Sequence, residues 1–306
     1  MNGTERAQLR MLPDGRRLHL QDGPIDLIVE AAGAPAVVAA AYRAATARFC
    51  LVLDELCGEL AELRAPATAA PRSFRGLVAR RMEAAVAPHA QGAFITPMAA
   101  VAGAVADEIL AAIRGATGEG LARISVNNGG DIALWLAPGE ATRVGLVSRP
   151  DRPALFARVR LAAADGIGGI ATSGAPGRSF SLGVADAVTI LASSAAEADA
   201  AATVVANAVD LPGDPRVERR PARSVQPDSD LGDRLVTRRV APLDPDSIAL
   251  ALDRGLAAAR PLIARGAIAA AALHLQGVTR AVSRDGRLMA LEAPQVEVIL
   301  RETLDA

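Results

Sequence analysis

The feature that most constrains the fold is a change of residue pattern near position 122. Before it, Pro35 to Arg64 is rich in Ala, Leu, Arg and Glu and has no internal proline, which predicts one or two helices. After it, short apolar segments alternate with Gly, Pro and Asp turns, as in an antiparallel meander. The predicted strands are Arg123–Val126, Asp131–Ala137, Thr142–Ser148, Phe156–Ala162 and Ala185–Ala192. This order predicts an α+β fold of antiparallel sheets packed with helices, in two intertwined lobes of one domain, and not a Rossmann fold.

Two further helices flank the strand region. Thr96 is a suitable N-cap and Pro97 takes the favoured first position of a helix over 98–114. One side of this helix carries small residues, which admit another backbone or a ligand but equally suit a tight core. Downstream, Ser194 and Glu197 form a capping-box pattern that predicts a helix over 194–209.

The last third of the chain reads as loop, helix and strand pair. Residues 211–246 are rich in Pro, Asp and Arg, which predicts a long flexible loop. Ser247–Arg265 follows as a helix. Ala271–Gln276 and Arg287–Leu291 are predicted to pair as strands around a turn at Asp285 and Gly286.

The composition excludes several classes of function. The net charge is −1 with only seven aromatic residues, so a nucleic-acid groove is not expected. The chain contains no lysine, which excludes a Schiff-base lysine. Cys50 and Cys57 are the two cysteines, and the apolar segments 98–114 and 255–275 carry charges or proline. We therefore expect a soluble, cytoplasmic protein without a membrane span, and a homo-oligomer is compatible with the sequence.

Two glycine-containing segments are candidates for nucleotide binding. In the turn Asn127–Asp131, adjacent glycines allow backbone amides to approach a phosphate, and Asp131 could contact a ribose hydroxyl; an ordinary hairpin turn explains the same residues. The glycine-rich loop 166–174 ends in Thr172, Ser173 and Gly174, whose hydroxyls could contact phosphate or metal-bound water. It lacks the Gly-Lys-Ser/Thr end of a P-loop, so a plain loop is the alternative.

Asp199 and Thr203 form a candidate metal site. Their i, i+4 spacing places both oxygens on one face of a helix, and oxygen ligands suit Mg²⁺. An acid in a first turn also simply offsets the helix dipole. The three histidines, His19, His89 and His274, show no ligand spacing, so we expect structural roles for them.

Taken in order, these motifs resemble the ApbE-like superfamily. They are Gly103-x-x-x-Asp107, Val126-Asn127-x-Gly129-Gly130-Asp131-Ile132, Ala171-Thr172-Ser173-Gly174, Val188-Thr189-Ile190-Leu191-Ala192 and Ala198-Asp199-x-x-x-Thr203. Characterised members are Mg²⁺-dependent FAD:protein FMN transferases. The resemblance is best over 94–210 and implies that residues 1–306 form a single ApbE-like domain. The segments 96–107 and 227–232 look closer to an uncharacterised cytoplasmic branch.

The resemblance also implies a site. A Mg²⁺ ion would be held by Asp199, Thr203 and the backbone carbonyl near Ala99. FAD or a related nucleotide would contact Thr96, Ala102, Asn128, Gly129, Gly130, Asp131, Thr172, Ser173 and Gly174. In the transferases the metal neutralises the pyrophosphate while a substrate threonine attacks the FMN phosphorus.

The sequence departs from the family pattern between the last two motifs. The transferases have a His-x-x-Asp-Pro-x-x-Gly segment there, whereas Ala175–Val184 is shorter and has no histidine. Arg178, Ser179, Ser181 and Asp186 are the available replacements. Two functions therefore stay open: FMN transfer or pyrophosphate cleavage, and non-catalytic flavin or nucleotide binding, or an interaction role, on the same fold.

Overall fold

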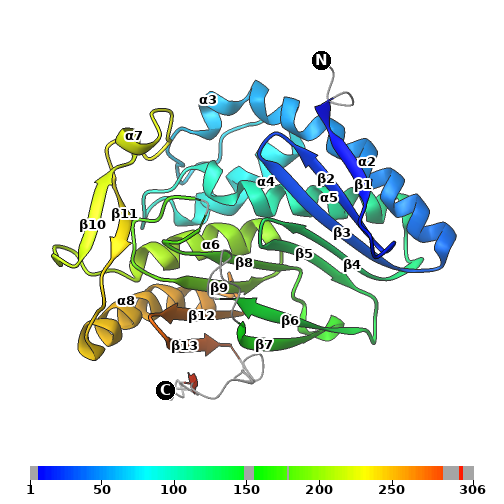
Figure 1. The fold of residues 1–306 in the computed structure, drawn as a ribbon. Coiled ribbons are helices and arrows are strands. Elements are labelled where there is room, and N and C mark those ends of the chain that lie inside the picture. The colour runs from blue at the N-terminus through cyan, green and yellow to red at the C-terminus, as the bar shows by residue number, and fades with distance from the viewer. Residues whose placement is uncertain (1–5, 148–154, 178, 285–295, 299–306) are drawn as a thin grey trace. The chain divides into compact units, whose positions relative to one another are not determined.

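The computed structural model describes residues 6–147, 155–177, 179–284 and 296–298, and it has the predicted α+β class (Figure 1). The chain divides into two compact units whose segments alternate along the sequence. Unit 1 comprises Met1–Ala141, Ala162–Ala171 and Ala192–Ala200, and unit 2 comprises Thr142–Leu161, Thr172–Leu191 and Ala201–Ala306. That the two form a single domain stays a prediction.

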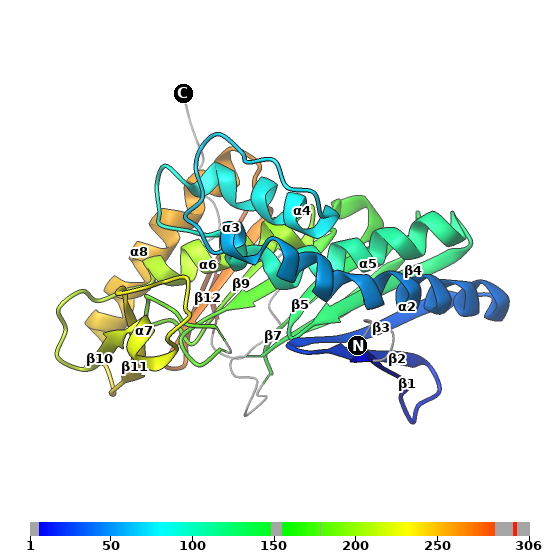
Figure 2. The same cartoon turned by 90° about the horizontal axis from the view of Figure 1, so that it is seen from above.

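Unit 1 is built on an antiparallel sheet covered by helices. In spatial order its strands are β1 (Gln8–Met11), β2 (Arg17–Asp22), β3 (Ile25–Gly33), β4 (Leu121–Asn128), β5 (Asp131–Leu136) and β8 (Gly169–Ser173), which enters unit 2 after Ala171. The long helices α2 (Pro35–Gly58) and α5 (Val101–Thr117) lie on the same side of β3 and β4 (Figures 1 and 2). Shorter helices lie between them in the chain: α3 (Leu60–Leu63), α4 (Leu77–Val86), η1 (Ala87–His89) and η2 (Pro97–Ala100).

Alternation along the strands gives unit 1 its core. Leu27 and Val29 of β3 and Ile124 and Val126 of β4 are fully buried, as strand residues with period two must be when one face packs. Helix α2 contributes Phe49 to the same core. At the far end of α5, the Arg114 guanidinium lies 4.6 Å from the ring centre of the single tryptophan, Trp135, on β5.

Four further strands and a covering helix lie in unit 2. Strands β9 (Ala187–Ala192), β12 (Ala270–Leu275) and β13 (Val278–Ser283) are antiparallel, and β14 (Val296–Val298) runs parallel to β13. Helix α8 (Pro245–Ala264) packs on β12 and β13 (Figure 1). The pair β6 (Ala141–Val147) and β7 (Leu155–Ala162) forms a separate sheet, followed by η3 (Ala163–Asp165). Helix α6 (Ala195–Ala208) begins in unit 1 and ends in unit 2.

All five strands predicted between 122 and 192 are present, but they do not form one meander. β6 and β7 pair only with each other, and β5 pairs instead with β8. Strand β8 was predicted as glycine-rich loop, because its glycines weaken the strand signal. Gly169 is required there, since a Cβ would overlap the backbone of Ser194.

The prediction of a flexible loop over 211–246 is wrong. The segment contains a two-stranded ribbon, β10 (Val217–Pro221) and β11 (Leu235–Val240), with the short helix α7 (Ala222–Val225) between them (Figure 1). The charged residues that read as loop hold it in place. Arg216 pairs with Asp214 and Asp244, both at 2.6 Å, and contacts Ser247 at 2.8 Å.

The predicted C-terminal strand pair is also wrong in its partner. β12 pairs with Val278–Ser283, and the chain turns at Gln276 and Gly277, whose φ angles are 43° and 87°. The turn expected at 285–286 and the strand at 287–291 lie outside the described residues. Gln276 tolerates its left-handed backbone because its N–H donates to Asp186 at 2.6 Å and its side-chain amide bonds Leu243 N and Ala241 O.

Among the described helices, α2 alone is long and apolar enough to cross a membrane, by length and composition only. Its buried residues face α5, β2 and β3, and 28% of its most apolar 18-residue window is buried. Core helices pass the same test, so this feature does not by itself indicate a membrane.

The crossing of α5 with the first turn of α6 depends on Gly103. A Cβ at Gly103 would overlap the carbonyl oxygen of Ala195, whereas a Cβ at Gly115, later on α5, would meet nothing within 4 Å. We expect Gly103→Ala to lower the free energy of unfolding by about 1–3 kcal/mol through overpacking. Gly115→Ala should raise it by up to about 1 kcal/mol through helix propensity. Urea denaturation of the two variants checks this, and equal effects would contradict the crossing.

Candidate functional site

Three segments of unit 1 meet at the start of α5. The Asn128 side-chain amide, at the end of β4, donates to the Ala102 carbonyl at 3.1 Å. The Asp199 carboxylate, on α6, accepts from the Gly103 N–H at 3.0 Å. Asn128 is 26 positions from Ala102 and Asp199 is 96 positions from Gly103, yet both bind the same helix end. Three of the five sequence motifs, those that contain Gly103, Asn128 and Asp199, therefore meet at this helix end.

Helices α5 and α6 cap each other. Asp107 of α5 accepts the backbone N–H groups of Ala195 at 3.0 Å and Ala196 at 2.9 Å. Asp199 of α6 in return caps the first turn of α5. The first N–H groups of a helix have no partner within the helix and carry partial positive charge. Each carboxylate therefore accepts hydrogen bonds from the first turn of the other helix and offsets the partial positive charge there. Asp107 was absent from the predicted site residues, although its spacing from Gly103 was part of the resemblance.

The local cap predicted for α6 is present in part. The Ser194 hydroxyl accepts from the Glu197 N–H at 3.3 Å, as a capping box requires. The Glu197 carboxylate, however, bonds the Ser193 hydroxyl.

The Asp199 carboxyl stands out electrostatically. Loss of water on burial raises its pKa well above the usual range, and Asp131 and Asp107 raise it further. The Gly103 and Ala102 amides act in the opposite direction. The side chain still keeps part of its surface accessible. The surroundings of Asp199 therefore disfavour its ionised form, and the residue is only half-buried, so a ligand can reach it.

The Asn127–Asp131 segment is the turn of a β-hairpin with a two-residue loop. Asn128 pairs with Asp131 across the turn, and Gly129 and Gly130 have φ angles of 65° and 118°, which only glycine adopts readily. The Gly130 N–H donates to the Asn127 side chain at 2.9 Å. Both glycines are exposed, and Asp131 faces the Asp199 charge. The turn has an ordinary structural explanation and also borders the start of α5.

The remaining predicted residues of unit 1 lie around the same helix end. Thr96 is buried and precedes η2 without making a side-chain cap, which differs from its predicted role. Its carbonyl instead accepts the Ala99 N–H at 3.0 Å. Ala99 and Ala102 are half-buried. Small side chains thus leave the backbone at the start of α5 partly accessible.

The other predicted site residues belong to unit 2. Thr172 and Ser173 end strand β8, and the Thr172 hydroxyl lies 2.9 Å from that of Thr189. Gly174 is required by packing, because a Cβ would overlap the Asp186 carbonyl oxygen. Thr203 lies on α6, one turn after Asp199.

Two of the four replacements considered for the missing histidine are held in structural contacts. The Ser181 hydroxyl accepts the Gly183 N–H at 3.2 Å, and Asp186 accepts the Gln276 N–H. Ser179 is exposed, and Arg178 lies outside the described residues. The ribbon covers this segment, since the Thr237 N–H donates to the Ser181 carbonyl at 2.9 Å and Arg238 lies over Phe180.

The histidines contact neighbouring side chains. His19 Nε2 lies 2.8 Å from Asp26, and His274 Nδ1 lies 2.7 Å from the Thr279 hydroxyl. Burial lowers the pKa of His274, and Asp186 partly opposes this.

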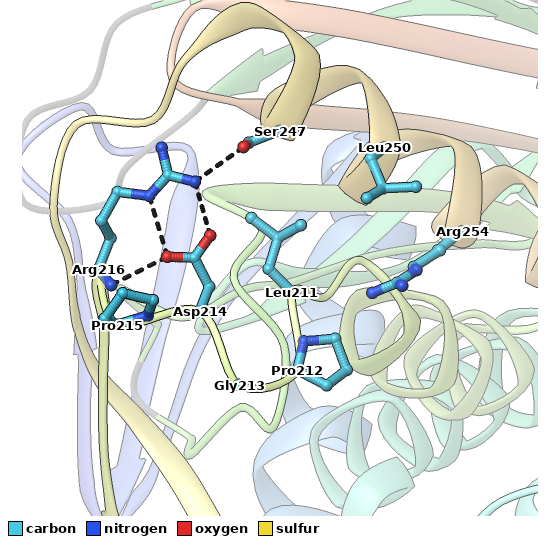
Figure 3. A pocket seen from close by; sticks show the side chains of 9 residues that line it. All are labelled: Leu211, Pro212, Gly213, Asp214, Pro215, Arg216, Ser247, Leu250 and Arg254. Carbon is cyan, nitrogen blue, oxygen red and sulfur yellow. Dashed lines mark hydrogen bonds and ion pairs between the residues drawn. The ribbon is translucent and has the colours of Figure 1, made fainter.

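A surface hollow lies in unit 2 between residues 211–216 and helix α8 (Figure 3). Leu211, Pro212 and Leu250 supply apolar lining, and Arg216 is already bound by Asp214 and Ser247. The hollow contains none of the predicted site residues. The second arginine that lines the hollow, Arg254, donates to the Asp210 carbonyl at 2.8 Å.

A metal at Asp199 would need ligands beyond carboxylates. Within the described ranges, no group of three or more His, Cys, Asp or Glu residues could hold a metal ion. Asp199, the neighbouring Asp131 and backbone carbonyls of the η2–α5 junction provide oxygen only. This chemistry fits Mg²⁺, which takes few protein ligands and keeps several waters.

Comparison with known proteins identifies related chains. A family model described as AbpE bacteria matches residues 9–281. A UPF0280 protein of Methanopyrus kandleri is 39% identical over 130 residues, which cover 42% of this chain and 48% of that protein. A UPF0280 protein of Methanosphaerula palustris is 39% identical over 133 residues, covering 43% and 52%. The chain spans about half the length of these curated relatives.

Two solved structures are similar to this one. The apo form of the Pseudomonas stutzeri flavinyl transferase ApbE covers 93% of this chain and 96% of its own, with 13% identity and a TM-score of 0.44. The ApbE protein of Thermotoga maritima covers 37% and 41%, with 22% identity and a TM-score of 0.31.

The reciprocal caps predict a stability effect. Asp107→Ala leaves the Ala195 and Ala196 N–H groups without their acceptor, so the free energy of unfolding should fall by about 1–3 kcal/mol. Asp246→Ala, which removes an acid from the first turn of α8, should change it by less than about 0.5 kcal/mol. Chemical denaturation followed by circular dichroism measures both. A small effect of Asp107→Ala would show that the caps contribute little.

His274 predicts a pH dependence. Its pKa is lowered in the folded state, so the neutral form stabilises the fold above the ordinary value of 6.5 and this stability is lost as the pH falls through the lowered folded-state pKa. The free energy of unfolding of the wild type should therefore drop more steeply between neutral and mildly acidic pH than that of His274→Gln. Urea titrations across this range test it, and parallel profiles would contradict it.

Proposed function

Since the family model covers residues 9–281, this chain belongs to the AbpE bacteria family, and we propose that it binds FAD or a related nucleotide diphosphate with Mg²⁺ at the start of α5. Membership confirms the resemblance to the ApbE-like superfamily, whose characterised members transfer FMN from FAD. The family supports a flavin-related function in general. The metal, the ligand and the residues that bind them are the proposal.

The observation that carries the proposal is the environment of Asp199. Among the described residues, three other buried acids are paired with arginine: Asp22 with Arg6, Glu83 with Arg72 and Glu108 with Arg48. Buried Asp107 is held by backbone N–H groups. Asp199 has instead two aspartates and two backbone amides among the groups that set its pKa. An acid kept in this state beside an accessible helix end favours a cation that arrives with the ligand.

The residues around Asp199 have distinct proposed roles. Asp199, Thr203 and the Ala99 carbonyl hold Mg²⁺, which when bound would neutralise the charge of a pyrophosphate. Asn128 fixes the hairpin to Ala102, so that the Gly129–Gly130 turn, which has no side chains, lies beside the helix end. Asp131 stands next to Asp199 and contacts the ribose or the metal-bound water. The resemblance also implies nucleotide contacts for Thr172, Ser173 and Gly174, which lie in unit 2.

Non-catalytic nucleotide binding is the second candidate. The family histidine is absent from Ala175–Val184, and Ser181 and Asp186 are engaged in holding backbone amides. This observation favours a binding protein over a transferase.

Binding predicts a metal-dependent gain in stability. FAD with Mg²⁺ should raise the melting temperature of the wild type, because a ligand that binds only the folded state stabilises it, by about 2.7 kcal/mol at a hundred times its Kd. Asp199→Asn should weaken Mg²⁺ binding at least tenfold while its amide oxygen can still cap Gly103. Glu197→Gln, an exposed acid on the same helix, is the matched control. Thermal-shift titrations with FAD, FMN, ADP and Mg²⁺ measure this, and no shift with any of them would sink the proposal.

Catalysis and binding give different products. If the protein binds FAD and transfers FMN or cleaves the pyrophosphate, incubation with FAD and Mg²⁺ releases AMP. A binding protein returns FAD intact. Chromatography of the nucleotides separates the two functions, and AMP release that persists in Asp199→Asn would contradict the proposed metal ligand.

A further inference from the structure

Helix α2 has a largely apolar face that the described residues leave uncovered. Its most apolar 18-residue window has a mean hydropathy of 1.5, yet only 28% of that window is buried. The buried side chains, including Ala45, Phe49 and Val52, face the other elements of unit 1. Exposed residues recur every three or four positions on the opposite side. We call this set the outer face of α2: Ala36, Ala39, Arg43, Ala47, Leu51 and Asp54.

The outer face has the properties of a helix-packing surface. Leu51 is 56% exposed, and three alanines allow a second helix to approach closely. A shallow hollow lies beside Arg43 and is lined also by Tyr42, Thr46 and Ala47. A hollow between residues one turn apart is the shape that receives a side chain from a facing helix.

The two charges of the outer face, Arg43 and Asp54, lie on either side of Ala47 and Leu51. Among the residues that the structure describes, Arg43 makes no hydrogen bond or ion pair. Asp54 is 56% exposed at its side chain and contacts Arg6 at 2.8 Å through one carboxylate oxygen. Arg43 and Asp54 are 11 residues apart, about three helical turns, so both side chains project from the same side of the helix.

We propose that the outer face of α2 binds the outer face of α2 in a second copy of this chain, antiparallel about a two-fold axis. In this arrangement Arg43 faces the partner subunit's Asp54, and by symmetry Asp54 faces the partner subunit's Arg43. The same register brings the partner subunit's Leu51 opposite Thr46, at the hollow. A single alignment thus gives Arg43 a carboxylate partner, adds a second arginine beside Asp54, which already contacts Arg6, and covers the exposed leucine.

The charge order selects a second copy over a lipid surface. An interfacial helix that binds anionic lipid carries several basic residues beside its apolar face. The outer face has one cation and one anion, and a membrane would leave Asp54 facing like charge. A face with the reverse order complements both charges, and an antiparallel copy of α2 has that order.

The first test measures the oligomeric state of the full chain. Light scattering after size-exclusion chromatography, over a hundredfold range of protein concentration, should show a dimer in equilibrium with monomer. Leu51→Arg should raise the dimer Kd at least tenfold, because it buries a charge against apolar residues. Leu250→Arg alters an equally exposed leucine on α8 and should leave the Kd unchanged. A wild type that is monomeric throughout, or a Leu51→Arg variant that dimerises normally, would overturn the proposal.

The second test exchanges the charges. Arg43→Asp and Asp54→Arg should each weaken dimerisation, because each places like charges opposite one another. The double variant R43D/D54R should recover most of the wild-type Kd, and circular dichroism confirms that each variant is folded. If the double variant is weaker than both single variants, the antiparallel alignment is wrong. A monomeric protein that sediments with anionic vesicles would assign the face to a membrane instead.

The third test needs no charge change. In a Cys57→Ser background, Ala47→Cys places two cysteines about 4.5 Å apart along the helix axis in the proposed register. Mild oxidation should give a disulfide-linked dimer, whereas Leu250→Cys in the same background should not. Equal cross-linking of both variants would indicate random collision and contradict the interface.

Discussion

The structure of unit 1 depends on two aspartates that are exchanged between two helices. Asp107 of α5 caps α6, and Asp199 of α6 caps α5, where the helices cross at Gly103. Two helix starts brought together would otherwise place like partial charges side by side. The exchanged carboxylates remove that repulsion and fix the spacing of the helices. The hairpin joins through Asn128, so sheet and helices share one reference point.

This arrangement gives Asp199 two requirements that oppose each other. As a cap it accepts the Gly103 N–H most strongly when ionised, but burial raises its pKa, and Asp131 and Asp107 raise it further. The chain solves the same problem elsewhere with arginine, most plainly at Glu108, which Arg48 and Arg81 contact at 2.8 Å and 3.1 Å. The proposed cation would give Asp199 the compensation that those acids have from side chains.

The sequence predicts those parts of the fold that local patterns encode. The five strands between 122 and 192 and the helices around 98–114 and 194–209 follow from periodicity and caps. The ribbon within 211–246 does not, because Arg216 joins residues 28 and 31 positions away, and composition shows charge without showing partners. The turn at Gln276 is equally hidden, since a left-handed glutamine is imposed by contacts with Asp186, Ala241 and Leu243.

The candidate site was predictable to a similar extent. Asn128, Asp131, Ala102 and Asp199 come together around one helix end. The importance of Asp107 was not predicted as part of the site, because its partners are backbone amides that no sequence pattern identifies. For Gly174, close packing against Asp186 accounts for the residue without any ligand.

The distance along the chain between the two caps has a consequence for biosynthesis. Asp107 precedes Ala195, whose N–H it accepts, by 88 residues. At about 5–20 residues per second, the ribosome needs roughly 4–18 seconds to translate this interval. During this time α5 has left the ribosome while its cap and its crossing partner have not been translated. A nascent chain that ends before residue 195 lacks one side of both exchanges. Unit 1 therefore completes its folding late, when most of the chain between its segments is already outside the ribosome.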